Sequence, residues 1–134
     1  MKRKTIWWIA LLIYLFVLFR ITVFRSGFSF DNLFGGTLNL SLFSEYMRFA
    51  SNGSWRVFLY YFLGNIICFI PFGALLCREK KNNAFAVFIV SLLLSITIEM
   101  LQFVFGTGVT EIDDVILNSC GSMLGYFLIK RISD

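Results

Sequence analysis

Four long apolar stretches constrain what this chain can fold into. They cover about residues 5–24, 55–76, 84–105 and 112–129. A helix that crosses the hydrocarbon core of a bilayer needs about 20 predominantly apolar residues, and each stretch comes close to that length. The pattern therefore predicts an all-α integral membrane protein: a four-transmembrane-helix bundle, formed as one domain over residues 1–134.

Composition supports this class and argues against others. Of the 134 residues, 58% are hydrophobic and 15% are charged, compared with roughly 45–50% and 25% in soluble domains. The net charge of +4 comes from short basic clusters between apolar runs, so we expect no nucleic-acid partner. The chain has no His, no nucleotide-binding glycine motif and no CxxC, so we expect no cofactor and no metal site. Cys68, Cys77 and Cys120 are interpreted as small buried apolar residues.

The positions of the positive charges predict the orientation. Three basic clusters fall on one side of a four-span bundle, while residues 106–111 contain no Lys or Arg. The clusters are Lys2, Arg3 and Lys4; Arg78, Lys80 and Lys81; and Lys130 and Arg131. Cytoplasmic loops carry an excess of such residues, which predicts a multi-pass protein of a bacterial plasma membrane with both ends in the cytoplasm. The first span lacks a small-residue cleavage site and is interpreted as an uncleaved anchor.

The first outer loop, residues 25–54, is the only long connection. Within it, Leu42, Phe43, Tyr46, Met47 and Ala50 fall on one face of a predicted helix over residues 41–50. This helix is interpreted either as a short amphipathic helix lying at the outer membrane interface or as a lid packed on the bundle.

Several polar residues lie inside the predicted spans. An ionisable residue costs at least about 2.5–3.5 kcal/mol at the bilayer centre, so it normally faces protein or water. Ser91, Ser95, Glu99 and Gln102 share one face of the third span, and the other spans contribute Arg20, Asn65, Asp113, Asp114 and Asn118. A rise of 1.5 Å per residue predicts that Arg20, Glu99, Gln102, Asp114 and Asn118 share one layer in the outer half of the membrane, with Asn65 near the middle.

This polar layer has two interpretations. It is either a ligand-binding pocket or a set of contacts that hold the helices together. Depth alone suggests that Arg20 pairs with Glu99 or Asp114. Gly121 and Gly125 form a small-xxx-small helix-packing face, and Pro71, which frees the carbonyl of Ile67, predicts a kink.

Three sequence blocks resemble the VanZ-like family, which is named for a protein associated with teicoplanin resistance. They are residues 64–73 (GNIICFIPFG, including Gly73), residues 95–102 (SITIEMLQ) and residues 112–126 (IDDVILNSCG with a following Gly-Tyr pair). The resemblance implies a membrane protein of Gram-positive bacteria that acts at the cell envelope. Two features depart from the family pattern: Leu42 stands where a Pro is expected, and residues 107–110 (TGVT) lack an expected Arg.

Three functional interpretations follow. In the first, a non-enzymatic protein binds membrane lipid, a lipid-linked envelope precursor, a glycopeptide or a protein partner at the polar layer. In the second, the chain is an enzyme that acts on a lipid head group, with Asp113 or Asp114 as base or metal ligand and Glu99 as partner. In the third, an ion path leads inward from Glu99 and Asn65, and this path lacks relay residues. The sequence identifies no catalytic residue, and the exposed Phe side chains also permit an oligomer.

Overall fold

The computed structural model describes residues 2–25, 28–77 and 83–133. In these ranges the long helices are α1 (Lys2–Thr22), α3 (Trp55–Cys77), α4 (Ala84–Phe105) and α5 (Ile112–Ser133). Four helices are long and apolar enough to cross a membrane, which confirms the predicted membrane bundle. The boundaries agree closely with the apolar stretches, although α5 continues to Ser133 and α1 already ends at Thr22.

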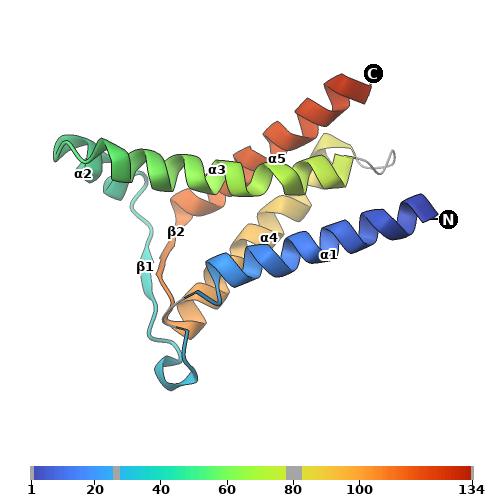
Figure 1. Cartoon of the computed structure of the whole chain (residues 1–134). Coiled ribbons are helices and arrows are strands. Elements are labelled where there is room, and N and C mark those ends of the chain that lie inside the picture. The colour runs from blue at the N-terminus through green and yellow to red at the C-terminus, as the bar shows by residue number, and fades with distance from the viewer. Residues whose placement is uncertain (1, 26–27, 78–82, 134) are drawn as a thin grey trace.

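Short elements occupy one end of the bundle. They are η1 (Phe30–Asn32), β1 (Thr37–Asn39), α2 (Ser44–Ser51) and β2 (Val109–Glu111). Strands β1 and β2 pair in parallel, with Thr37 opposite Val109 and Asn39 opposite Glu111. The sequence did not predict these strands, which tie the first outer loop to the α4–α5 connection. Figure 1 shows α2 and both strands at one end of the molecule, and the N- and C-termini at the other.

Helices α3 and α5 pack with their backbones in contact. A Cβ atom added at Gly73, Gly121 or Gly125 would overlap backbone atoms of the facing helix. Small residues permit this close approach in membrane proteins, where helices associate through van der Waals packing and interhelical hydrogen bonds. The three glycines therefore have the structural role predicted for them. Pro71 lies inside α3, which continues through it to Cys77.

Helix α1 is attached to α3 by hydrogen bonds from aromatic side chains. Trp7 Nε1 donates to the carbonyl oxygen of Leu75 (2.9 Å), and the hydroxyl of Tyr14 donates to the carbonyl oxygen of Cys68 (2.8 Å). The prediction that the cysteines are buried is wrong for Cys120, which is exposed on α5. A thiol is apolar enough to face lipid there.

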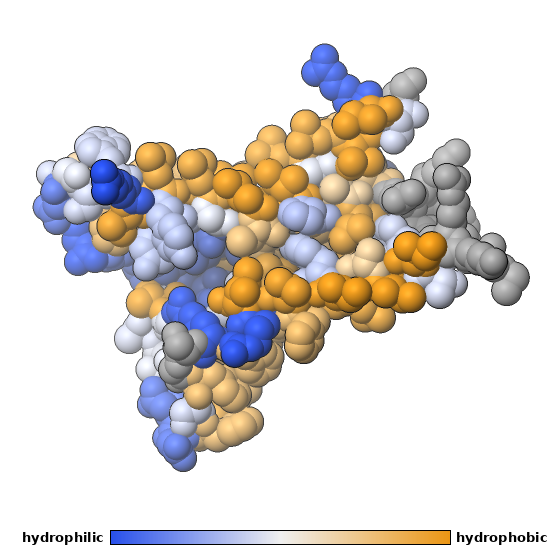
Figure 2. Space-filling view, in the orientation of Figure 1, coloured by the Kyte–Doolittle hydropathy of each residue, from blue (hydrophilic) through white to orange (hydrophobic). Residues whose placement is uncertain are grey.

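The two ends of the bundle have different surfaces. Figure 2 shows hydrophilic residues gathered around α2 and the loop end, and hydrophobic residues along α1 and α3. Both termini lie at the same end, as four membrane crossings require (Figure 1). The predicted cytoplasmic cluster Arg78, Lys80 and Lys81 lies outside the described residues.

Candidate ligand-binding cleft

A cleft of about 890 Å³ lies between the end of α1, helix α2, the first half of α3 and the two strands. We call it the Asp114 cleft. Its larger polar side chains are Arg25, Asn39, Glu45, Arg48, Asn65, Gln102, Glu111 and Asp114. Its aromatic side chains are Tyr46, Phe49, Tyr60 and Tyr61. The structure brings three of the candidate ligand-binding residues to this cleft: Asn65, Gln102 and Asp114. The full set of candidates from the sequence is Arg20, Asn65, Glu99, Gln102, Asp113, Asp114 and Asn118.

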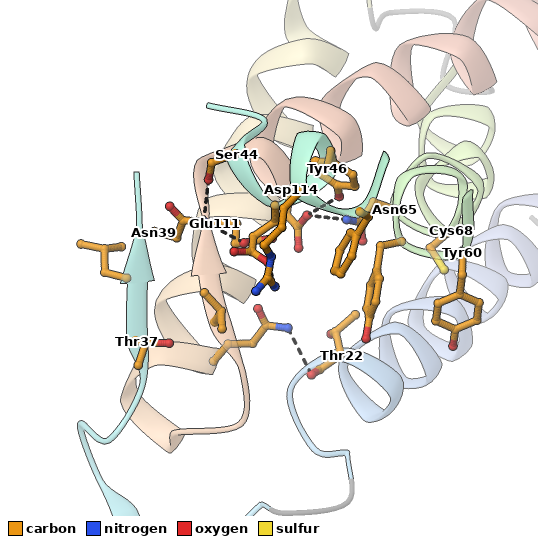
Figure 3. Close-up of a pocket in the computed structure, with 18 of the residues that line it drawn as sticks. Thr22, Thr37, Asn39, Ser44, Tyr46, Tyr60, Asn65, Cys68, Glu111 and Asp114 are labelled. Atoms are coloured by element: carbon orange, nitrogen blue, oxygen red, sulfur yellow. Dashed lines mark hydrogen bonds and ion pairs between the residues drawn. The ribbon is translucent and has the colours of Figure 1, made fainter. Parts of the chain in front are cut away.

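Asp114 is the carboxylate that links three elements at the cleft. It lies in the first turn of α5, where the helix dipole favours negative charge. Its Oδ1 atom accepts hydrogen bonds from Asn65 Nδ2 on α3 and from the hydroxyl of Tyr46 on α2 (3.3 Å). Figure 3 shows both donors pointing toward this carboxylate. Asn65 is therefore level with the start of α5 and lies in the same layer as Asp114.

Asp113 faces a different partner. Its side chain is 1% exposed, and Oδ2 accepts a hydrogen bond from the backbone N–H of Phe43 (2.8 Å). Phe43 immediately precedes α2 and has a left-handed backbone with φ 54°. Such a conformation costs about 1–3 kcal/mol in a non-glycine residue, so it persists only where its surroundings fix it. Asp113 therefore holds the start of α2 and does not line the cleft.

Glu99 positions β2. Its side chain is buried, and Oε2 accepts a hydrogen bond from the backbone N–H of Glu111 (2.9 Å). Its carbonyl oxygen accepts a second bond from the hydroxyl of Thr110 (2.9 Å). These bonds fix the strand whose last residue, Glu111, lines the Asp114 cleft. Glu99 itself faces a separate, smaller cavity of about 180 Å³.

Asn118 connects two helices. Its Nδ2 atom donates to the hydroxyl of Ser95 on α4 (2.8 Å), and both side chains are buried. The interpretation of the polar layer as helix–helix contact therefore fits Asn118. Asp114 and Gln102 also form hydrogen bonds between helices, to Asn65 on α3 and Thr22 on α1, but both line the cleft as well.

Arg20 does not join the layer. It is exposed, and its guanidinium donates to the carbonyl oxygen of Phe24, so the predicted pairing with Glu99 or Asp114 is not formed. The side chain that lines the cleft is Arg25, whose Nε donates to the carbonyl oxygen of Thr107 (2.6 Å). Its guanidinium lies against Gly108, so Arg25 supplies a cation beside the segment that lacks one in the sequence.

Helix α2 packs on α3 and covers the cleft. The ring of Tyr46 meets those of Phe58 and Phe62 edge to face (5.8 and 5.7 Å between centroids), and Phe49 stacks on Tyr61 (6.1 Å). Tyr46 is 3% exposed, whereas Met47 is 70% exposed. These contacts favour the lid interpretation of this helix.

The sequence analysis did not identify Glu111, Asn39, Tyr46 or Arg25 as site residues. Glu111 lies just outside the apolar stretch at residues 112–129, so the search for polar residues within the spans does not include it, although it is close to the two aspartates in sequence. Burial raises the pKa of Glu111 above its ordinary value, and the hydrogen bond that Asn39 Nδ2 donates (3.1 Å) opposes the shift. Burial and the neighbouring negative charge of Asp114 also raise the pKa of Tyr46.

The carboxylates do not form a recognisable metal site. Within residues 2–25, 28–77 and 83–133, no three side chains of His, Cys, Asp or Glu converge as metal ligands.

Comparisons with known proteins agree with the resemblance in the sequence. A family model described as VanZ/LLP1 matches residues 11–133. A protein named VanZ, from Enterococcus faecium, is 40% identical over 96 residues. That match covers 66% of this chain and 57% of the relative, so the matched region spans little more than half of the relative's length. No solved structure matches this chain.

Proposed function

Because this chain belongs to the VanZ/LLP1 family, we propose that it acts at the cell envelope and contributes to tolerance of teicoplanin-type glycopeptides. In this proposal it binds a lipid-linked envelope ligand in the Asp114 cleft. The observation that carries the proposal is the position of the cleft between two membrane-spanning helices. Ile21 and Thr22 at the end of α1 line one side, and Tyr60, Gly64 and Asn65 of α3 line another.

The lining suits a molecule with a polar head and an apolar chain. Asp114, Asn65 and Glu111 provide hydrogen-bonding groups inside the cleft. Ile21, Leu38 and Tyr60 are each more than half exposed at its margin. A lipid could therefore place its head group against the carboxylates while its chain stays beside the helices, without leaving the membrane.

The orientation is part of the proposal. With the basic clusters inside, the Asp114 cleft and α2 face the outer side of the membrane, which is the side of the cell envelope. A fluorescent protein fused to the C-terminus should fold and fluoresce in the cytoplasm. Alkaline phosphatase inserted after Gly53, in the turn between α2 and α3, should be active. The opposite pattern would place the cleft inside and contradict the proposal.

The test of function is glycopeptide susceptibility in a sensitive Gram-positive host. The native chain should raise the inhibitory concentration of teicoplanin, and Asp114→Asn and Glu111→Gln should abolish that rise at equal membrane levels. Tyr46→Phe is the matched control, because it removes the hydrogen bond to Asp114 but keeps the carboxylate. Full tolerance in the carboxylate variants would exclude the cleft as the working site. If expression of the native chain leaves the inhibitory concentration of teicoplanin unchanged, the role in tolerance is excluded.

A further inference from the structure

The Asp114 cleft contains two carboxylates that no cation neutralises. Asp114 accepts hydrogen bonds only at Oδ1, from Asn65 and Tyr46, and Glu111 accepts only at Oε1, from Asn39. All these donors are neutral. Among the described residues, Asp114 Oδ2 and Glu111 Oε2 have no hydrogen-bond donor.

Among the described residues, neither arginine of the cleft forms an ion pair with Asp114 or Glu111. Arg48 forms an ion pair with Glu45 on the same helix, the one ion pair found among the described residues. Arg25 donates through Nε to the carbonyl oxygen of Thr107. The charged side chains that line the cleft are thus three carboxylates and two guanidiniums, a net charge of −1, and Asp114 and Glu111 have no ion pair among the described residues.

The side chain of Gln102 provides a third acceptor that lacks a donor. The side chain of Gln102 is only 9% exposed and lines the cleft. Its Nε2 atom donates to the carbonyl oxygen of Thr22 (3.3 Å), but its buried Oε1 atom has no partner within the part of the chain that the structure describes. A buried acceptor without a donor is destabilising, so a ligand that supplies the donor gains binding free energy at this atom.

We propose that the ligand of the Asp114 cleft is a lipid whose head group ends in a primary ammonium. This inference rests on the proposed function and names the chemistry of its ligand. A primary ammonium carries one positive charge and three N–H donors. Asp114 Oδ2, Glu111 Oε2 and Gln102 Oε1 provide three acceptors, of which two are charged. Charge-assisted hydrogen bonds of this kind are roughly twice as strong as neutral ones.

An ammonium fits these groups better than a metal ion does. A divalent cation would need several oxygens at about 2.0–2.6 Å, and the carboxylates of the described residues do not converge in that way. An ammonium accepts longer contacts of about 2.7–2.9 Å and uses an amide oxygen as readily as a carboxylate. The aromatic ring of Tyr60, which is 76% exposed, also lines the cleft and provides an aromatic surface for a cation.

The experiment is native mass spectrometry of the purified full chain with three lysolipids. Lysophosphatidylethanolamine carries the primary ammonium, its N-acetyl derivative lacks the charge, and lysophosphatidylcholine keeps the charge but has no N–H donor. The native chain should bind the ethanolamine lipid at least about tenfold more tightly than either analogue, which is about 1.4 kcal/mol. In Glu111→Gln and Asp114→Asn the preference should fall below about threefold.

Asp31→Asn is the matched control, since this carboxylate lies on η1 outside the cleft and should leave the preference unchanged. Glu111→Gln keeps an oxygen that can accept the bond from Asn39, so it provides a folded variant if Asp114→Asn misfolds. Equal binding of the three lipids would overturn the ammonium proposal and leave the lipid-binding function intact. Displacement of the lipid by millimolar Mg²⁺ would overturn it in favour of a metal ion.

Soluble phosphoethanolamine separates the ammonium from the lipid chain. Weak competition is expected, because the apolar part of the ligand contributes to binding. Competition as strong as that of the lysolipid would support recognition of the ammonium but contradict the proposed lipid-linked ligand. Absence of binding by every lipid and by phosphoethanolamine would overturn both proposals.

Discussion

Replacing Gly121 with Ala should separate the two helices on which the cleft is built. A Cβ atom at this position overlaps the carbonyl oxygen of Ile66 and lies 2.9 Å from its carbonyl carbon and 3.0 Å from its Cα. These obstructing atoms belong to the backbone of α3, so no side-chain rotation can relieve the overlap. Helix α5 must therefore move away from α3 along part of its length.

The size of the effect follows from two opposing terms. Overpacking of a tight interior costs typically about 1–3 kcal/mol, and backbone obstruction places Gly121 at the upper end. The greater helix propensity of Ala relative to Gly offsets about 1 kcal/mol of this cost. We therefore expect Gly121→Ala to lower the free energy of unfolding by about 2 kcal/mol.

Gly64 provides the matched control on the facing helix. A Cβ atom added there meets no atom within 4 Å, so Gly64→Ala should keep the propensity gain and raise stability by up to about 1 kcal/mol. Both variants can be compared by reversible unfolding in mixed micelles with increasing dodecyl sulfate. Equal stabilities for the two variants would refute the backbone contact. A Gly121→Ala/Gly125→Ala double variant should cost less than the sum of the single changes, because one displacement of α5 relieves both overlaps.

Three further predictions concern polar groups. Asp113→Ala should cost about 1–3 kcal/mol in the same unfolding assay, because the part-buried hydrogen bond from the N–H of Phe43 is lost; a neutral effect would show that this bond does not hold α2. A double-mutant cycle on Ser95→Ala and Asn118→Ala should give a coupling energy of about 0.6 kcal/mol, and zero coupling would contradict the α4–α5 hydrogen bond. Because burial raises the pKa of Glu111, the folded state holds that proton more tightly than the unfolded state. The resulting stability is fully present below the unfolded pKa of about 4.3 and is lost as pH rises through the folded pKa. Glu111→Gln should remove this part of the pH dependence, and identical pH profiles for the two proteins would contradict the assignment.

The sequence predicted the spans well because a single property, sustained apolar length, decides them. The same applies to Gly121 and Gly125, since small residues at helical spacing indicate a face for close packing. The β1–β2 pair was not predictable. Three-residue strands about 70 positions apart leave no periodic signal, and their pairing depends on how the helix ends are arranged.

The composition of the site was only partly predictable because the depth estimate aligned the spans at a common level. The contact between Asn65 and Asp114 shows that α3 starts well beyond α5. Because of this stagger, Asn65 lies in the layer of the acidic residues. The first turns of α3 extend beyond that layer, and α2 packs on these turns. Helical spacing also identifies a shared face without identifying the neighbour. Glu99 and Asn118 were therefore recognised as inward-facing but not as partners of Glu111 and Ser95.

The two consecutive aspartates at the start of α5 each accept a hydrogen bond from the α2 region. Neighbouring residues on a helix point about 100° apart, so Asp113 reaches the backbone at the start of α2 while Asp114 faces the cleft. The bond from the N–H of Phe43 to Asp113 is 2.8 Å long, whereas the bond from Tyr46 to Asp114 is 3.3 Å long and shares its acceptor Oδ1 with Asn65. Both donors to Asp114 use Oδ1, so Oδ2 can accept a ligand while α2 stays attached through Tyr46 and Phe43.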